Sequence, residues 1–323
     1  MTARPIVTLG EILVEIMADE VGHGFLSPLR LLGPFPSGAP AIFIDQVAKL
    51  GHPCGIISAV GDDDFGRVNL ERLRRDGVDV RAVAIDTERP TGSAFVRYRP
   101  DGERDFVFNV RHSASGHTAL TPPARELLAG GGHFHVMGSS LFSEGLVRAV
   151  REAVEIVRGG GGTISFDPNI RKEMLASSGM REALGWVLRH CDIFLPSGPE
   201  LTLLSEAKSD DAAAAELLAL GIGAVVAKHG SDGATYYDRD TRLHVPAFPA
   251  EALDPTGAGD CFGATFVTCR LGGRTVQDSL RYAAASGAHA VTRRGPMEGT
   301  ASLSELDAFI GPGNEGRRAG ASA

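Results

Sequence analysis

The sequence predicts an α/β protein built around a mostly parallel β-sheet. Short apolar runs with the length of buried strands alternate along the chain with helix-like segments. Residues 54–60, 67–75 and 78–85 form one such series of strand, helix and strand, which is the order of a βαβ unit. Several strand-like runs end on a glycine or a polar residue, at the point where open α/β sheets place their ligands.

Length and composition are those of a globular protein. The chain has 323 residues, of which 43% are hydrophobic and 22% charged, and its formal net charge is −8. The acidic balance argues against a nucleic-acid partner, which would need concentrated Lys and Arg. No apolar run approaches the ~20 residues that cross a membrane, so no membrane contact is expected. We find no internal repeat and no linker that divides the chain.

The amino terminus and the cysteines indicate a cytoplasmic protein. Residues 1–6 lead directly into a strand-like run and contain no apolar signal-peptide segment. The cysteines form no CxxC pair, and a disulfide framework or zinc knuckle is therefore not expected. They lie far apart or inside predicted core segments, at Cys54, Cys191, Cys261 and Cys269.

The first predicted strand, residues 6–13, contains a candidate binding residue, Glu11. Glu11 follows a glycine where the strand ends, so it is expected to contact a ligand, with a solvated strand end as the alternative. Residues 14–36 are interrupted by Gly and Pro and predict a short antiparallel excursion from the main sheet. A helix is then expected from about Gly38 to Lys49.

Three further segments each allow two interpretations. The acidic residues 62–64 precede a helix, and N-capping explains them more simply than a metal site. Residues 93–99 and 104–111 predict a β-hairpin whose interleaved basic and aromatic residues would suit nucleic acid, but the acidic net charge argues against this. His133 and His135 share one face of a predicted strand, and a plain strand is favoured over a metal site that lacks a third ligand.

The stretch 254–263 carries the strongest chemical signal. Pro255 favours a turn, and small, apolar residues after Asp260 predict a buried helix that begins at about Gly257. The unpaired amides of such a helix start, together with the helix dipole, form a site for phosphate. A carboxylate inside an anion site is explained if it acts as a general base beside developing negative charge. The alternative is a glycine-rich helix start with an acidic cap.

The order of these motifs resembles that of the ribokinase-like carbohydrate kinases, also called the PfkB family. Residues 257–260 match its G-A-G-D signature, 167–171 its D-P-N-x-R, 197–200 its N-x-x-E and 228–233 its K-x-G-x-x-G. The likeness extends from Leu9 to about Ile310. The chain departs from the family pattern at four positions: Ser37, Ile42, Ser197 and Thr265.

The resemblance implies a three-layer α/β/α fold with a mostly parallel central sheet and a small β-lid. It implies one kinase domain over residues 1–310, with lid segments at about 12–36 and 92–111, and residues 311–323 are expected to be a disordered tail. In the family, the lid covers the sugar and often pairs two subunits, so a homodimer through the lid is expected.

The resemblance also assigns roles. Asp260 would deprotonate the sugar hydroxyl, while Arg171 and the amides of Gly257, Ala258 and Gly259 would stabilise the transferred phosphoryl group. Besides Asp260, the implied sugar contacts are Glu11, Gly38, Ala39, Tyr98, Phe108, Arg111, Asp167 and Asn169. The implied nucleotide contacts are Ser197, Lys228, Gly230, Gly233, Gly257 and Gly259, with residues 292–295 on the adenine side. ATP and Mg²⁺ are implied, with Glu200 holding Mg²⁺ through water, and a monovalent cation such as K⁺ is a further candidate.

The predicted activity is ATP-dependent phosphorylation of a sugar. Residues 10–17, 33–44 and 292–300 look like the tagatose kinase branch, which predicts transfer to a primary hydroxyl of a ketohexose, D-tagatose first, with a 6-phosphate product. Fructose and 2-keto-3-deoxygluconate are the alternative substrates, and a non-catalytic sugar sensor on the same fold is the alternative class. A Rossmann dehydrogenase or a P-loop kinase would need G-x-G-x-x-G after the first strand or G-x-x-x-x-G-K-[ST], and neither occurs.

Overall fold

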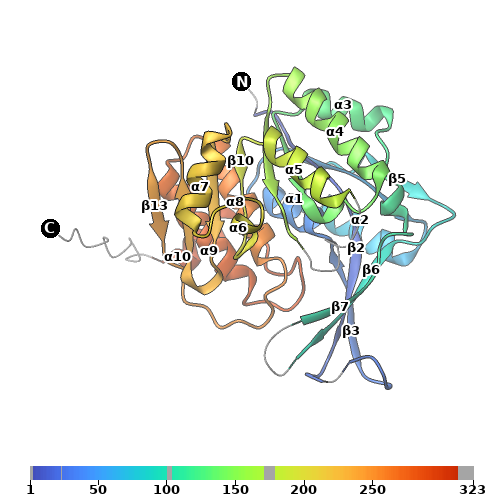
Figure 1. The fold of residues 1–323 in the computed structure, drawn as a ribbon. Coiled ribbons are helices and arrows are strands. Elements are labelled where there is room, and N and C mark those ends of the chain that lie inside the picture. The colour runs from blue at the N-terminus through green and yellow to red at the C-terminus, as the bar shows by residue number, and fades with distance from the viewer. Residues whose placement is uncertain (1–2, 23, 100–103, 171–178, 312–323) are drawn as a thin grey trace.

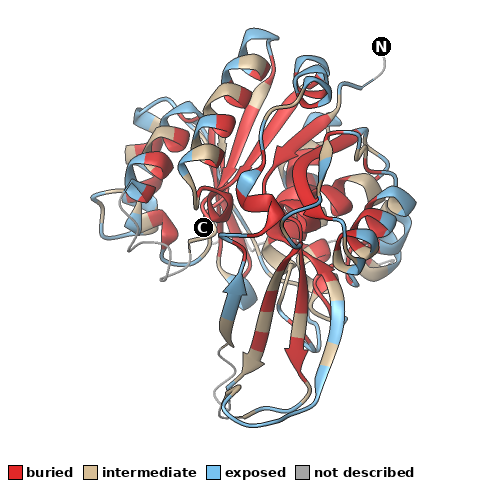
Figure 2. Ribbon diagram, turned by 90° about the vertical axis from the view of Figure 1, so that its right-hand side faces the viewer, coloured by how far each residue is buried: buried red, intermediate tan, exposed pale blue. Residues whose placement is uncertain are grey.

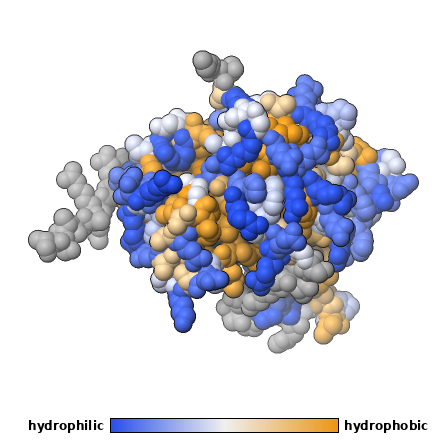
Figure 3. Space-filling model, turned by 45° about the horizontal axis from the view of Figure 1, so that its top comes forward, coloured by the Kyte–Doolittle hydropathy of each residue, from blue (hydrophilic) through white to orange (hydrophobic). Residues whose placement is uncertain are grey.

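The computed structural model describes residues 3–22, 24–99, 104–170 and 179–311. Arg171 and the predicted tail beyond Gly311 lie outside these residues. No helix in the described ranges is long and apolar enough to span a membrane. On the face that Figure 3 shows, hydrophobic residues lie among hydrophilic ones.

Within the described part of the chain, nine strands form the central sheet, and the pairs from β5 to β11 are parallel. In spatial order the strands are β13 (Arg242–Val245), β12 (Ala234–Tyr237), β11 (Ala224–Lys228), β10 (Ile193–Phe194), β9 (Thr163–Asp167), β8 (His133–Met137), β1 (Ile6–Leu9), β4 (Cys54–Gly61) and β5 (Val83–Asp86). The pairs β11–β12 and β12–β13 at one edge are antiparallel. The sheet confirms the predicted mostly parallel α/β architecture.

Helices cover both faces of this sheet, as Figure 1 shows. One core cluster contains residues of α3 (Pro122–Gly130), α4 (Glu144–Gly159), α5 (Met180–His190), α6 (Glu200–Leu203) and α7 (Asp210–Ala219). The cluster on the other face contains residues of α1 (Ala39–Lys49), α2 (Asp64–Asp76), α8 (Ala258–Leu271) and α9 (Val276–Ala290), and α10 (Leu303–Ile310) packs against α9. Strand residues alternate between the two clusters, so both faces of the sheet are buried.

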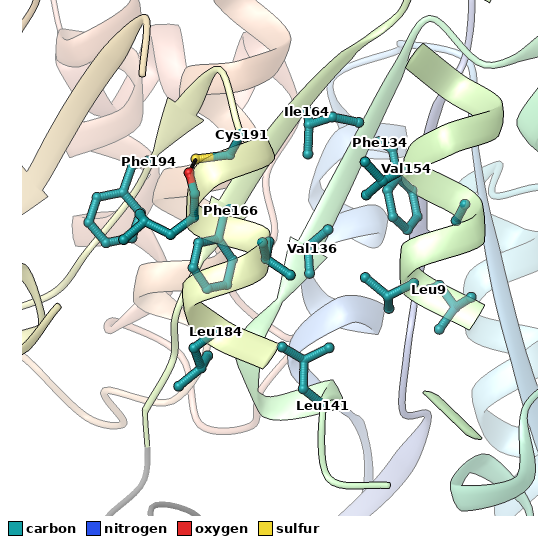
Figure 4. Packing of buried hydrophobic residues seen from close by; sticks show 14 of the residues in the cluster. Leu9, Phe134, Val136, Leu141, Val154, Ile164, Phe166, Leu184, Cys191 and Phe194 are labelled. Atoms are coloured by element: carbon teal, nitrogen blue, oxygen red, sulfur yellow. Dashed lines mark hydrogen bonds between the residues drawn. The ribbon is translucent and has the colours of Figure 1, made fainter. Parts of the chain in front are cut away.

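The first core cluster lies between strands β8 to β10 and helices α4 and α5. Figure 4 shows Val136 of β8 and Phe166 of β9 among the buried side chains of this cluster, together with Leu184 of α5. Phe166 and Phe194 are also in ring contact, with centroids 5.7 Å apart. Because these side chains are fully buried, they hold the strands whose carboxyl ends form the site.

A second sheet projects from this body (Figures 1 and 2). Over the described residues it contains four strands in the order β3 (Leu31–Ser37), β2 (Leu13–Ala18), β6 (Gly92–Tyr98) and β7 (Arg104–Asn109). Strands β2 and β6 are parallel and central, while β3 and β7 are antiparallel edges. We call it the small sheet; it is the small β-sheet that the sequence predicted as part of the fold.

Two of the predicted strands are shorter than expected. The strand expected over 78–85 begins only at Val83, because the Asp79 carboxylate accepts the amide of Arg81 and bends the chain. The strand expected from Asp192 is reduced to the two residues of β10, which ends shortly before Pro196, a residue with no amide to donate. Both deviations arise from side-chain and proline effects that apolar patterns do not report.

Two interpretations from the sequence are confirmed. Asp63 caps α2, since its Oδ1 accepts the amide of Gly66 at 2.8 Å. His133 and His135 lie on β8, and a ring nitrogen of each is 2.7 Å from the Ser165 hydroxyl of β9. Burial of both rings lowers their pKa values, that of His133 to about 3, so both histidines are neutral parts of the core.

Candidate active site

A cavity of about 420 Å³ lies between the carboxyl ends of the central strands and the small sheet. It is bounded by the ends of β1, β9 and β11, the first turns of α1 and α8, and strand β7. The predicted site residues that line it are Glu11, Gly38, Ala39, Phe108, Arg111, Asp167, Asn169, Ser197, Glu200, Lys228, Gly257, Gly259 and Asp260. The structure therefore brings together residues that are up to 249 positions apart, from Glu11 to Asp260.

Glu11 lines the cavity just beyond the carboxyl end of β1. The Ser139 hydroxyl donates to its Oε1 at 2.9 Å, and the Ser140 hydroxyl donates to its Oε2 at 2.5 Å. The carboxylate is only 6% exposed, so the alternative of a solvated strand end is wrong. Its two oxygens are oriented by neutral donors and are suited to accept hydroxyl groups of a ligand.

The first turn of α8 also lines the cavity. Gly257 is the N-cap with φ 81°, and a Cβ at this position would lie 2.5 Å from the Pro296 carbonyl oxygen. No side chain in the described ranges caps this helix. The amide of Ala258 lies 3.5 Å from the Pro255 carbonyl oxygen, whereas Gly257 and Gly259 line the cavity, so this helix start is suited to an anion. Asp260 lies in the same turn and is 8% exposed. An anion site and a carboxylate are thus adjacent.

Asn169 connects the end of β9 to this turn. Its side-chain Nδ2 donates to Asp260 Oδ1 at 3.5 Å, and its backbone amide donates to Asp167 Oδ1 at 3.1 Å. Asn169 has a φ of 40°, which asparagine tolerates better than most residues. The side chain of Ile42, where the family usually has Asn, packs against Gly257 instead of presenting a polar group.

Lys228 and Asp167 form a buried ion pair at the cavity. Glu200 lies beside them, and its carboxylate accepts the amide of Ile170 at 2.6 Å and the amide of Ser197 at 2.7 Å. Burial, followed by the charge of Asp167, raises the pKa of Glu200 to about 7. Glu200 thus ties the chain after β9 to the chain after β10.

The carboxylates of Asp167 and Glu200 suit a Mg²⁺ ion with few protein ligands. Both Asp167 and Glu200 line the cavity. In the described ranges, no group of three or more His, Cys, Asp or Glu side chains is arranged to hold a metal. Mg²⁺ commonly takes one or two carboxylates and completes its shell with water and phosphate oxygens. The donor set therefore fits Mg²⁺, which Glu200 would hold through water.

Four predicted site residues do not line the described cavity. Tyr98 is the last residue of β6, and its hydroxyl donates to Asp254 at 3.0 Å rather than lining the cavity. Gly230 begins the 3-10 turn between β11 and β12, and Gly233 follows it. Ala258, the first residue of α8, packs against the core cluster that contains α1 and α8. The structure does not describe Arg171, so its placement is untested.

Ser139, Arg104, Phe106 and Phe142 are among the lining residues that the sequence analysis did not select. Ser139 follows the carboxyl end of β8, and the strand-end rule that selected Glu11 would have found it. Arg104, Phe106 and Phe108 occupy every second position of β7. The two-residue period of a strand would therefore have placed Arg104 and Phe106 on the same face as Phe108. Phe142 follows the same strand end as Ser139 but carries no polar signal.

The chain matches the sequence profile of a family described as pfkB family carbohydrate kinase over residues 6–302. It is 32% identical to fructokinase-1 of Zea mays over 303 residues, which cover 90% of this chain and 93% of that protein.

Solved structures are similar over nearly the whole chain. A putative ribokinase II from E. coli, in complex with ATP and Mg²⁺, is 51% identical with a TM-score of 0.90, over 96% of this chain and 99% of that one. A fructokinase from Vibrio cholerae, with fructose, ADP and calcium bound, is 25% identical with a TM-score of 0.82, over 96% of this chain and 100% of that one.

Proposed function

The chain belongs to the pfkB family of carbohydrate kinases, and on this premise we propose that it phosphorylates a ketohexose at a primary hydroxyl, with fructose as the first candidate. It is an ATP-dependent sugar kinase that uses a divalent cation, for which Mg²⁺ fits. The observation that carries the proposal is that Asp260, in the first turn of α8, lines the same cavity as Glu11.

The choice of fructose revises the order of substrates expected from the sequence. The curated relative described above is a fructokinase, and so is a solved structure with fructose bound. This supports fructose over D-tagatose, which we retain as the second candidate. Glu11 and Glu15 both line the cavity and are buried, so they favour a neutral polyhydroxylated sugar over 2-keto-3-deoxygluconate, whose carboxylate they would repel.

In the proposed mechanism, Glu11 accepts sugar hydroxyls and orients the reacting hydroxyl toward Asp260. Asp260 removes its proton, and Asn169 helps to hold the carboxylate. The first-turn amides from Gly257 to Gly259 stabilise the charge of the transferred phosphoryl group. When bound, Mg²⁺ neutralises charge on the nucleotide phosphates. Lys228 and Ser197, which line the same cavity, would contact that nucleotide.

The test is a coupled assay of ATP consumption with D-fructose, D-tagatose, 2-keto-3-deoxygluconate and D-ribose. We expect the highest kcat/KM with a ketohexose and product phosphorylated at a primary carbon. A preference for ribose or for the sugar acid would contradict the proposed substrate. Sugar binding without ATP consumption would favour the alternative of a non-catalytic sensor.

We also propose a homodimer that pairs through the small sheet. Leu31 of β3 and Val107 of β7 are large hydrophobic residues that are 45% and 50% exposed on its two edge strands. A change of Val107 to Asp should shift the protein toward the monomer in analytical ultracentrifugation, and an unchanged mass would contradict this contact.

The buried, free cysteines of the chain support the cytoplasm as its compartment.

A further inference from the structure

Two residues of the small sheet form hydrogen bonds to the turn before α8, residues 254–256. Tyr98 of β6 and Arg104 of β7 lie directly opposite each other in their antiparallel pair. The Tyr98 hydroxyl donates to Asp254 Oδ1 at 3.0 Å, and the Arg104 guanidinium donates to Thr256 Oγ1 at 2.6 Å. One cross-strand pair thus makes both contacts to the residues just before Gly257.

Asp254 is the centre of the turn. Its side chain is fully buried, and it also accepts the amide of Thr256 and the amide of Gly295, each at 3.0 Å. The same oxygen, Oδ1, receives the Tyr98 hydroxyl and the Thr256 amide. The small sheet is therefore bonded to the carboxylate that shapes the start of the phosphate-binding helix.

Arg104 touches the cavity as well as the turn. It lines the cavity with Phe106, and its guanidinium carbon lies 5.6 Å from the centre of that ring. Its charge is directed to the Thr256 hydroxyl. Arg104 is therefore placed between the residues that would cover the sugar and the turn that would hold the phosphate.

We propose that Tyr98 and Arg104 are positioning residues for phosphoryl transfer, which act through Asp254 and Thr256 to align the first turn of α8 with the sugar beneath the small sheet. The inference rests on the proposed function. The sugar site and the anion site come from distant parts of the chain, and a shift of ~1 Å between reacting groups can lower the rate by about 10²-fold. The pair connects the two sites directly.

The kinetic test is a double-mutant cycle of Arg104→Met and Thr256→Val, with Tyr98→Phe measured beside it. Each single change should lower kcat with the preferred ketohexose by roughly 10-fold, within the range that misalignment produces, and leave the KM for ATP unchanged. The double variant should be no worse than either single variant, because one contact is lost in each. Arg97→Met is the matched control, since its contacts in the described ranges are to Gly22 and Asp105, and it should retain the wild-type kcat.

Hydrogen exchange gives a readout that does not depend on the substrate. Amides of residues 257–260 should exchange faster in Tyr98→Phe and Arg104→Met than in the wild type and in Arg97→Met. Unchanged exchange, additive losses in the cycle, or a rise in sugar KM alone would overturn the positioning role. A wild-type protein that phosphorylates no ketohexose would contradict the proposed function, while exchange would still test the alignment.

Discussion

Helices α1 and α8 begin at the same cavity, each after a glycine, and their first turns differ in charge. Each has a glycine N-cap with positive φ, 112° at Gly38 and 81° at Gly257, and no side-chain cap in the described residues. The two helices pack against each other. The first turn of α8 contains Asp260, whereas that of α1 has no acidic residue and carries its carboxylate, Asp45, two turns from its start. We therefore expect the start of α1 to serve binding and the start of α8 to serve proton transfer.

The largest effect is expected from Asp260→Asn, which makes the first turn of α8 as neutral as that of α1. Loss of a general base typically lowers kcat by ~10²–10⁴-fold. The fold and ATP binding should be retained, because the amide has the same shape and the helix start is unchanged. The coupled assay measures kcat, and calorimetric titration measures ATP affinity. Near-normal turnover would exclude Asp260 as the base.

The two cap glycines allow the comparison to be tested at matched positions. A Cβ at Gly257 would lie 2.5 Å from the Pro296 carbonyl oxygen, and one at Gly38 would lie 2.4 Å from the Glu11 carbonyl oxygen. Each change to Ala should cost about 1–3 kcal/mol in the free energy of unfolding because of the positive φ. Gly257→Ala should mainly lower kcat, whereas Gly38→Ala should mainly raise the KM for the sugar. Denaturant titration and steady-state kinetics measure the two effects. The same kinetic change in both variants would show that the two helix starts do not differ in role.

A smaller effect is expected at the sugar end from Ser139→Ala. This change removes the donor 2.9 Å from Glu11 Oε1 and leaves the Ser140 contact. Loss of one hydrogen bond to a buried carboxylate should raise the KM for the sugar by roughly 10-fold, in line with about 1–3 kcal/mol for a charged group, with kcat unchanged. A fall in kcat at constant KM would place Ser139 on the catalytic side of the cavity instead.

The smallest effect on turnover is expected from Asp45→Asn. Asp45 contacts Arg72 and Thr300 away from the cavity, and burial raises its pKa to about 7 from 3.8. The folded state therefore holds a proton that the unfolded state loses, so this contribution to stability is full below about pH 4 and declines as pH rises to about 7.

The contribution of Asp45 to the free energy of unfolding should fall by up to about 1.4 kcal/mol per pH unit. The change Asp45→Asn should remove this pH dependence while kcat stays the same. Urea unfolding at a series of pH values measures the slope. An unaltered pH dependence in the variant would contradict the assignment.

The sequence was informative where the evidence is local. The apolar runs that predicted the strands, the glycine turn before α8 and the cap at Asp63 all involve residues within a few positions of each other. Long-range partners were not predicted. Tyr98 was expected at the sugar, but its hydroxyl bonds to Asp254, 156 positions away, and nothing near either residue in the chain indicates this pair.

By itself, the sequence determined the alternation of strands and helices, the positive-φ glycine at the start of α8 and the carboxylate in its first turn. These follow from periodicity, backbone sterics and capping, which act over one or two turns of chain. The tertiary structure alone decided which strand ends share a cavity, that Lys228 pairs with Asp167, and that Tyr98 and Arg104 reach the turn before α8. Those contacts depend on how the sheets twist and pack, and such packing joins groups that have no local relation in the sequence.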